Sequence, residues 1–588
     1  MNTRLILVLI VLASCIANGA ETQPLPRPNV VVFLADDQGW GDLGINGNTM
    51  LRTPHIDSIA RSGATFDRFF VCPVCSPTRA EFFTGRYHPR TGVSGVSTGQ
   101  ERLNLTERTV ANAFKAAGYA TGAFGKWHNG SQWPYHPNAR GFDEYYGFTS
   151  GHWGEYFDPP LEHNGRDVRG TGYIADDFTT HAIQFIETNR HRPFLCYIPF
   201  NTPHSPWAAP KEDWDRFRNH AVPQRGNAPA AENLDETRCV LAMTENLDRN
   251  VGRVLAKLDE LGLATNTIVV YFSDNGPNTA RWNNGMKGRK GTTEEGGVRS
   301  PLFIRWPGKI PSGSKLTGIS GAIDLMPTLC ALASVPKSTA LPIDGLDLSK
   351  QLLAGSGVLP DRRIFSHWNN NVSVRTAKYR MDTKGALFDM EKDPDQKRDV
   401  AAENPTVTEE LRTAMADWRR EVLGPARAPD SRPLPVGYRQ FPITPLPARD
   451  GVPHGTVRRS ANAPNSSYFV NWETLEDSIT WDIEVATAGT YDVVIDYACP
   501  LADAGSKIEL RFGDSALTGV VTPGWYPPLH TNQDTIPRPV GESRMKDFRP
   551  LALGAITLAK GRGQLTLRAL EIPGNTVMEV RRLKLTLR

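Results

Sequence analysis

The sequence predicts an α/β fold with a largely parallel sheet between helices, followed by a C-terminal β-sandwich. Between residues 29 and 272, short apolar runs rich in β-branched residues alternate with stretches of helical period. This alternation is typical of a parallel sheet that is covered on both faces. After residue 454, apolar residues recur at every second position between glycines, as in antiparallel strands. The 588 residues suffice for two or three domains.

The expected elements follow in chain order. The apolar run at 29–35 predicts a strand buried on both faces, and Thr53-Pro54 predicts the start of a short helix that ends by Gly63. Three helix–strand pairs come next: Glu107–Ala117 with Tyr119–Phe124, Asp177–Thr188 with Pro193–Phe200, and Glu236–Leu261 with Asn266–Phe272. The sandwich strands are expected at Tyr491–Tyr497, Lys507–Phe512, Gln564–Leu570 and Val577–Leu587.

The first twenty residues predict an export signal. Arg4 precedes the apolar run Leu5–Leu12, small residues follow through Ala20, and the run is too short to span a membrane. Cleavage after Ala20 would release the protein. Alternatively, Cys15 ends a lipobox-like segment and would carry a lipid anchor. We therefore expect a periplasmic or extracellular protein, attached to a membrane only if Cys15 is lipidated.

Charge and cysteine content exclude some classes of function. The formal net charge of +3 gives no case for a nucleic-acid partner, so an acidic ligand needs a local basic site. The spacing of the seven cysteines shows neither a disulfide framework nor a zinc pattern. Buried free thiols are expected at Cys196, Cys239 and Cys330, which lie in apolar strand-like or helix-like runs.

Polar side chains close four of the predicted strands. In parallel sheets, ligands bind beyond the carboxyl ends of the strands, so these side chains predict one shared site. The four endings are Asp36 with Asp37, Lys126 with His128, His204 alone, and Asp274 with Asn275.

Two kinds of chemistry are represented among these candidates. Asp36, Asp37, Asp274 and Asn275 offer only oxygen ligands, which suit Ca²⁺ or Mg²⁺ and not zinc. Helix capping is the alternative for a single Asp, but a double Asp and a distant Asp-Asn favour a metal. The second set is basic and suits a tetrahedral anion beside that metal: Arg79, Lys126, His128, His204 and Lys290.

Cys75 is the candidate nucleophile. Ser76 and Pro77 predict an N-cap and a first helical residue, which places Cys75 at a helix N-terminus with Arg79 one turn on. The residues alone therefore predict a thiolate of lowered pKa. The C-x-x-C formed with Cys72 would also suit redox chemistry, but the residues after Cys75 argue against it.

The segment Cys75–Gly85 carries the pattern C-x-P-S/T-R-x(4)-T-G, and here the chain resembles the type I sulfatases of the alkaline phosphatase superfamily. The resemblance covers roughly residues 28 to 425. Supporting motifs occur in the family's order: Leu34–Gly39, the GKWH of Gly125–His128, the P-H-x-P of Pro203–Pro206, Ser273–Gly276, the K-G-x-x-x-E-G-G of Lys290–Gly297, and Ala386–Asp389 with Asp393-Pro394.

The resemblance implies a mixed, mostly parallel sheet between helices and a small antiparallel-sheet subdomain. It also implies that a separate maturase oxidises Cys75 to Cα-formylglycine. One hydroxyl of its hydrate attacks sulfur, and the second is then deprotonated so that the hemiacetal collapses and releases sulfate. The substrate expected is a sulfated carbohydrate or an aryl sulfate.

The family roles transfer to matching positions of this chain. Ca²⁺, in preference to Mg²⁺, would be held by residue 75 with Asp36, Asp37, Asp274 and Asn275. Arg79 and Lys126 would hold the hydrate and His128 would be the base, while His204 and Lys290 would bind sulfate and protonate the leaving alcohol. Lys290 is preferred to Lys287 by the K-G-T spacing. The chain departs from the family pattern at Asn129 and Glu294, where an apolar residue and an aromatic residue are usual.

The expected domains are a catalytic domain at 28–345, its smaller subdomain at 346–423, a Pro-rich linker at 424–453 and the sandwich at 454–588. Trp525 and Tyr526 in the sandwich would stack on a sugar ring or be buried against the catalytic domain. Two other functions compete. A phosphatase or phosphodiesterase of this superfamily would use Thr or Ser with two zinc ions, and a sugar-binding protein would have lost catalytic residues that are intact here.

Overall fold

The computed structural model describes residues 27–425 and 430–588. The predicted export signal at 1–20 and Cys15 lie outside the described residues. Within them, no helix combines the length and the apolarity that crossing a bilayer requires. All six described cysteines are free and buried, as expected for Cys196, Cys239 and Cys330.

The central sheet has twelve strands, and its middle four are parallel. In the register, Val31 pairs with Cys196 on one side and with Val269 on the other. Because the four strands run in the same direction, their carboxyl ends meet at one edge. In spatial order they are β8 (Thr267–Ser273), β1 (Asn29–Ala35), β7 (Phe194–Pro199) and β3 (Ala120–Lys126).

Beyond these four strands the sheet is mixed, so the predicted fold class is confirmed. β10 (Leu302–Arg305) runs antiparallel to both β8 and β2 (Ala64–Phe70). The remaining strands are β4 (Glu144–Phe148), β5 (Pro160–His163), β6 (Arg166–Arg169), β9 (Arg299–Ser300), β11 (Ser314–Gly321) and β12 (Ser356–Val358).

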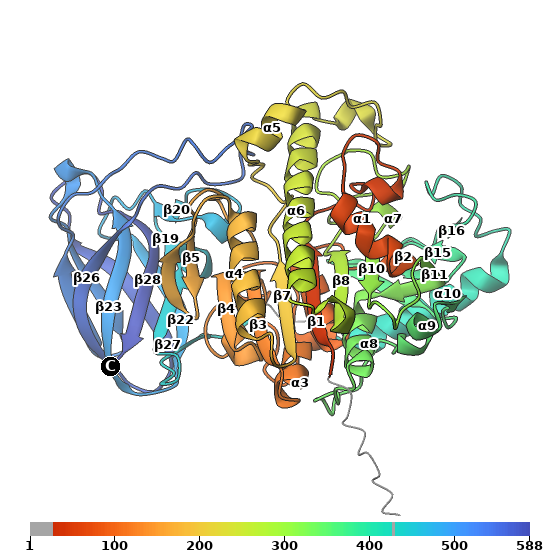
Figure 1. The fold of residues 1–588 in the computed structure, drawn as a ribbon. Helices are drawn as coiled ribbons and strands as arrows, with labels where there is room; N and C mark the ends of the chain where they lie inside the picture. The colour runs from red at the N-terminus through yellow and green to blue at the C-terminus, as the bar shows by residue number, and fades with distance from the viewer. Residues whose placement is uncertain (1–26, 426–429) are drawn as a thin grey trace, which may run out of the picture.

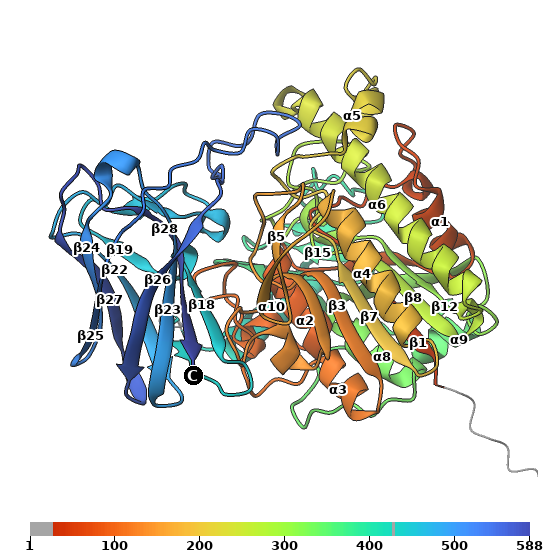
Figure 2. The same cartoon turned by 60° about the vertical axis from the view of Figure 1, so that its left-hand side comes forward.

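Helices cover both faces of the sheet (Figures 1 and 2). The sheet separates two apolar cores, and alternate residues of β1 pack into each of them. Val31 and Phe33 pack into the first core, and Val30 and Val32 pack into the second. This explains why β1 is apolar at every position. The first core includes α1 (Pro54–Arg61), α4 (Ile174–Thr188) and α6 (Leu234–Glu260), and the second includes α2 (Cys75–Thr84), α3 (Val110–Ala116), α8 (Leu325–Leu332) and α9 (Ser349–Ala354).

The expected small antiparallel sheet has four strands, and α10 (Pro405–Trp418) packs on it. Its strands are β13 (Ile364–Trp368), β14 (Asn371–Arg375), β15 (Tyr379–Met381) and β16 (Leu387–Asp389).

The C-terminal region contains two six-stranded sheets around one apolar core. Trp481 of one sheet and Tyr491 of the other are both fully buried in that core. The longer strands are β22 (Ser478–Val485), β23 (Gly489–Ala498), β24 (Lys507–Phe512), β25 (Ser515–Val520), β26 (Arg549–Leu558), β27 (Gly561–Glu571) and β28 (Glu579–Leu587).

Three strands lie in the segment that the sequence predicts as a linker. They are β17 (Leu434–Val436), β18 (Ile443–Pro447) and β19 (Val452–His454), and each pairs with a single sandwich strand. Each is therefore an edge strand, where proline is tolerated because one row of backbone groups needs no partner. Proline content alone did not reveal them. The domain boundaries at 345, 423 and 453 stay a prediction.

The C-terminal sheets lie beside the α/β part, and the long connection between β25 and β26 reaches across to it (Figure 1). In this connection, Ile536 packs into the first core of the α/β part. The hydroxyl of Thr535 accepts a hydrogen bond of 2.8 Å from the backbone N–H of Ala209. The two parts therefore share an ordered interface.

We expect Phe82→Ala to destabilise the α/β part by about 3–5 kcal/mol, since it leaves a cavity under the helix that carries Cys75. Phe82 is 1% exposed, and its ring centroid lies 5.1–5.6 Å from those of Phe83, Tyr197 and Phe272. Denaturant unfolding measures the change. Phe82→Leu, which keeps most of the volume, should cost clearly less, and an equal cost for both would contradict this packing argument.

Candidate functional site

The predicted site residues converge at the carboxyl edge of the four parallel strands. Asp36 and Asp37 follow β1, Asp274 and Asn275 follow β8, and Lys126 is the last residue of β3. Backbone hydrogen bonds fix these endings: Asp274 donates to Ala35, and Asp36 donates to Thr202 beyond β7, both at 3.1 Å. Cys75 and Arg79 arrive on α2, and His204 and Lys290 arrive on loops.

Each carboxylate of the site is paired with a basic group. Asp36, Asp37 and Asp274 are fully buried, so their charges need compensation. The pairs are Lys126 Nζ with Asp36 at 2.6 Å, Arg79 Nη2 with Asp274 at 2.8 Å, Lys290 Nζ with Asp37 at 2.7 Å, and His204 Nε2 with Asp37 at 3.5 Å.

The two candidate lysines, Lys290 and Lys287, have different partners. Lys290 contacts Asp37 in the site, whereas Lys287 is half exposed and pairs with Glu294 at 3.2 Å. The lysine preferred from the K-G-T spacing is thus the one at the site. Glu294, one of the departures from the family pattern, forms this peripheral ion pair.

Repulsion among the carboxylates shows in their pKa values. Burial, followed by the charge of Asp36, raises the pKa of Asp274 to about 6, although Arg79 opposes the shift. Burial also acts to raise the pKa of Asp37. There His204, Lys290 and the hydrogen bond from Asn275 outweigh it and lower the pKa. At Asp274, burial and the repulsion from Asp36 are therefore only partly offset by Arg79.

The oxygen donors fit a hard cation. One ligand atom each of Asp36, Cys75 and Asp274 lies within 4.8 Å of the others, and the same holds for Asp36, Asp37 and His204. Among the described residues, Oδ1 of Asp36 and Oδ1 of Asn275 are buried and accept no hydrogen bond. Unpartnered buried acceptors beside repelling carboxylates suit an oxygen-seeking divalent cation.

Cys75 differs from the expectation drawn from the residues alone. It is the first residue of α2, with Val74 as the N-cap, and only 3% of it is exposed. Burial raises the pKa of its thiol; Lys126 and Lys290 oppose this, while Asp274 and Asp36 add to it. The predicted thiolate of lowered pKa is wrong, because lost hydration outweighs the helix terminus and the nearby lysines.

His128 is held in a strained and well-defined orientation. Its backbone has φ of 64°, as does that of Asp37, and such conformations concentrate at functional sites. Its Nε2 lies 2.8 Å from the carbonyl of Val96, so in the neutral ring Nε2 carries the proton. Nδ1 is buried and has no partner among the described residues. Burial, with Lys126, lowers the pKa of His128 well below its usual value.

His204 is also neutral near pH 7. Burial lowers its pKa to about 4, because the opposing effect of Asp37 is smaller and Lys290 and Lys126 add to the decrease. The ring of His152 stacks on it, with centroids 5.7 Å apart.

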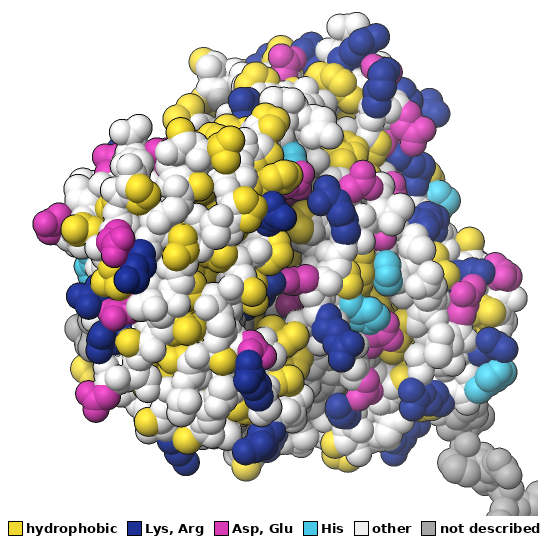
Figure 3. All heavy atoms as spheres, turned by 90° about the vertical axis from the view of Figure 1, so that its left-hand side faces the viewer, with side chains coloured by type: hydrophobic (Ala, Val, Ile, Leu, Met, Phe, Trp, Pro, Cys, Tyr) yellow, Lys and Arg dark blue, Asp and Glu magenta, His cyan; other side chains and the backbone are white. Residues whose placement is uncertain are grey.

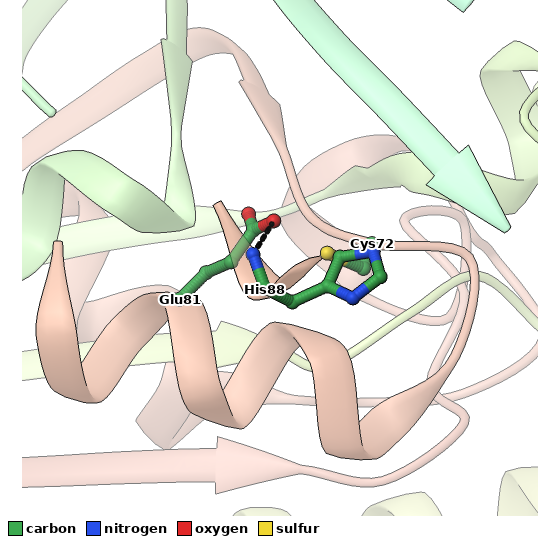
Figure 4. A group of neighbouring side chains, drawn as sticks. All are labelled: Cys72, Glu81 and His88. Carbon is green, nitrogen blue, oxygen red and sulfur yellow. Dashed lines mark hydrogen bonds between the residues drawn. The ribbon is translucent and has the colours of Figure 1, made fainter. Parts of the chain in front are cut away.

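Cys72 belongs to a different cluster, with Glu81 and His88 (Figure 4). The backbone N–H of His88 donates to Glu81 at 3.1 Å. Burial raises the pKa of Glu81 to about 8 and that of Cys72 well above its usual value. Neutral groups that hydrogen-bond to each other tie α2 to the following segment, and the C-x-x-C forms no disulfide.

Four residues at or beside the site were missed by sequence reasoning. Thr78 lies inside the recognised motif, and its hydroxyl donates to the carbonyl of Asp274 at 2.5 Å. His152 lies in the loop after β4 and gave no periodic signal. Asn465 and Glu542 come from the C-terminal region: the amide of Asn465 donates to Val96 at 3.4 Å, and Glu542 accepts from Ser205 at 2.6 Å.

Comparison with known proteins shows which family this chain is similar to. Residues 28–335 match the family model described as Sulfatase. The chain is 33% identical to N-acetylgalactosamine-6-sulfatase of Mus musculus over 405 residues, which cover 63% of this chain and 74% of that protein. It is 32% identical to arylsulfatase A of Homo sapiens over 400 residues, which cover 60% and 74% of the two chains.

Solved structures of known proteins share the fold of this chain. The crystal structure of Ps i-CgsB in complex with k-i-k-neocarrahexaose superposes with a TM-score of 0.61 at 30% identity. The match covers 69% of this chain and 95% of that one. A sulfatase domain across more than half of the chain, relatives that are themselves sulfatases, and a matching fold lead to one conclusion. The chain belongs to the sulfatase family of the alkaline phosphatase superfamily and is a sulfuric ester hydrolase.

Proposed function

We propose that this protein releases sulfate from a sulfated carbohydrate, with Cys75, oxidised to formylglycine, as the nucleophilic residue at a Ca²⁺ site. The observation that carries the proposal is the convergence of Cys75, three buried carboxylates and four basic side chains at one sheet edge. A neutral, buried thiol is a weak nucleophile. The raised pKa of Cys75 therefore favours modification of this residue over direct attack by its sulfur.

The cation would be held by Asp36, Asp37, Asp274, Asn275 and residue 75. An all-oxygen set of acidic and amide side chains is the ligand type of Ca²⁺, and its flexible geometry suits Ca²⁺ better than Mg²⁺. When bound, the cation supplies positive charge that polarises a sulfate oxygen. It would also offset the burial and the repulsion from Asp36 that raise the pKa of Asp274.

The side chains around residue 75 have distinct roles in the proposed reaction. Arg79 and Lys126 are fully buried next to Cys75, and they hold and orient the modified residue 75. His128 has an unprotonated Nδ1 without a partner and is the base that takes a proton there. Lys290 binds the sulfate, and His204, in its protonated form, gives the proton on Nε2 to the leaving alcohol.

The substrate class rests on the similar proteins. One of them is named for N-acetylgalactosamine 6-sulfate chemistry, and another was solved with an oligosaccharide bound. A sulfated polysaccharide, or an oligosaccharide derived from it, is therefore the proposed substrate, and an aryl sulfate would serve as an artificial one. We also propose that a separate maturase modifies Cys75, and that the chain is exported, as residues 1–20 predict.

Co-expression with a maturase should convert Cys75 with a loss of about 18 Da, since an aldehyde oxygen replaces the thiol. Mass spectrometry of the tryptic peptide measures the converted fraction, and release of sulfate from 4-nitrophenyl sulfate should rise in proportion to it. Cys75→Ala should abolish turnover, whereas Cys72→Ala keeps residue 75 and retains activity. Complete conversion without cleavage of any sulfate ester would contradict the proposal.

Calcium should stabilise the folded protein by mass action, by about 2.7 kcal/mol at a hundred times its Kd. We expect EGTA to lower the melting temperature, Ca²⁺ to restore it and Mg²⁺ to restore less. Asp36→Asn should lose this response, because it removes a charged ligand. Asp492→Asn makes the same change at an exposed ion pair in the C-terminal region and should respond like the parent protein. A full Ca²⁺ response in Asp36→Asn would refute this site.

A further inference from the structure

A cavity of about 120 Å³ lies between the α/β part and the C-terminal sheets. Its walls come from both parts, including Phe148 and Trp153 on one side and Asn465 and Arg581 on the other. At roughly 30 Å³ per water molecule, it holds about four waters, or an anionic group with part of a sugar ring.

The cavity adjoins the catalytic site. Asn465 lines the cavity, and its amide donates to the carbonyl of Val96, the same carbonyl that lies 2.8 Å from Nε2 of His128. On the opposite wall, Phe148 is the neighbour of Lys126 in the β3–β4 pairing. A group in the cavity is therefore separated from the catalytic residues by single side chains.

Arg449, Arg581 and Arg582 all line the cavity, and Arg449 pairs with Asp450 at 3.4 Å. Arg581 differs from the other two. It forms no ion pair among the described residues, whereas the adjacent Arg582 pairs with Asp167 and Asp496. Its guanidinium lies 5.9 Å from the ring centroids of both Trp153 and Phe548, so aromatic faces hold it in place. Burial raises the pKa of Glu155 and the charge of Arg581 opposes this shift, but no ion pair joins the two side chains.

The backbone supports this placement. In the pairing of β23 with β28, Asp496 is opposite Arg582 and Tyr497 is opposite Val580, so Arg581 is the extra residue of a β-bulge. Bulges re-aim a side chain and are frequent beside active sites.

A second donor in the cavity wall has no partner. Nε1 of Trp153 is buried and forms no hydrogen bond among the described residues. The Trp153 ring stacks on Phe148 at 5.1 Å, and Arg581 lies over it, so these two side chains fix the orientation of the ring in the cavity wall. The carboxylates in the wall are already engaged: Glu162 with His136, and Asp167 with Arg582 and Lys584.

We infer that this cavity binds a second anionic group of the substrate, a sulfate or a carboxylate on a sugar unit next to the one that is desulfated. Arg581 supplies the charge, and the ring of Trp153 holds its guanidinium in place. The inference rests on the proposed function, since it names a recognition site for the same substrate. On the face shown in Figure 3, positive and negative side chains are interspersed.

The test compares the parent protein with Arg581→Gln, Arg581→Lys and the control Arg588→Gln, which changes an exposed arginine just beyond the far end of β28. The substrates are 4-nitrophenyl sulfate and disaccharides with one sulfate, two sulfates, or one sulfate and one carboxylate. For the doubly charged disaccharides we expect Arg581→Gln to raise KM about tenfold with little change in kcat, and Arg581→Lys to recover most of the loss. Kinetics on 4-nitrophenyl sulfate should stay at the parent level.

The pair of doubly charged disaccharides distinguishes sulfate from carboxylate as the group that is bound. Equal losses on all substrates, or no change on any, would overturn the inference. If the parent protein cleaves no sulfate ester, the proposed function fails. Calorimetric binding of the same disaccharides to Cys75→Ala, with and without Arg581→Gln, then decides whether the cavity recognises a second anionic group.

Discussion

The burial of three carboxylates at one sheet edge is the constraint on which the catalytic site depends. Asp36, Asp37 and Asp274 have no access to solvent, and an uncompensated buried charge costs several kcal/mol. Their partners arrive from β3, from α2 and from the loop that contains Lys290. These distant segments can satisfy one another only if the parallel centre of the sheet brings its carboxyl ends together. The fold thus brings a basic partner to each buried carboxylate, and the ion pair of Arg79 with Asp274 in turn ties α2 to the sheet.

The sequence revealed those parts of the site whose signals are local. The apolar runs that end in Asp36-Asp37 and Asp274-Asn275 predict both the strands and their polar endings, and parallel topology then predicts that they meet. The protonation state of Cys75 could not be obtained in this way. A helix terminus and nearby lysines favour a thiolate, but burial depends on how α2 packs under the sheet edge, and burial prevails.

In the C-terminal region, several strands and contacts could not be predicted from local sequence patterns. Its long strands were predictable from period-two patterns, whereas β17, β18 and β19 were hidden in a proline-rich segment because edge strands tolerate proline. The contacts of Asn465 with Val96 and of Glu542 with Ser205 join residues more than 300 positions apart. No periodicity or composition of one chain encodes which loops meet over such a separation.

The two parts of the protein contribute different residues to the site and to the cavity beside it. The matched sulfatase domain ends at residue 335 and contains all the charged residues around Cys75. The C-terminal region instead contacts Val96, whose carbonyl lies against His128, and Ser205 beside His204, and it supplies Arg581 to the neighbouring cavity. A sulfate group looks alike on every sugar, so the buried charges that bind it under the proposed function have little power to distinguish substrates. Discrimination must come from groups that contact the rest of the molecule, and by our inference Arg581, which forms no ion pair among the described residues and stands at a bulge beside the adjoining cavity, is such a group.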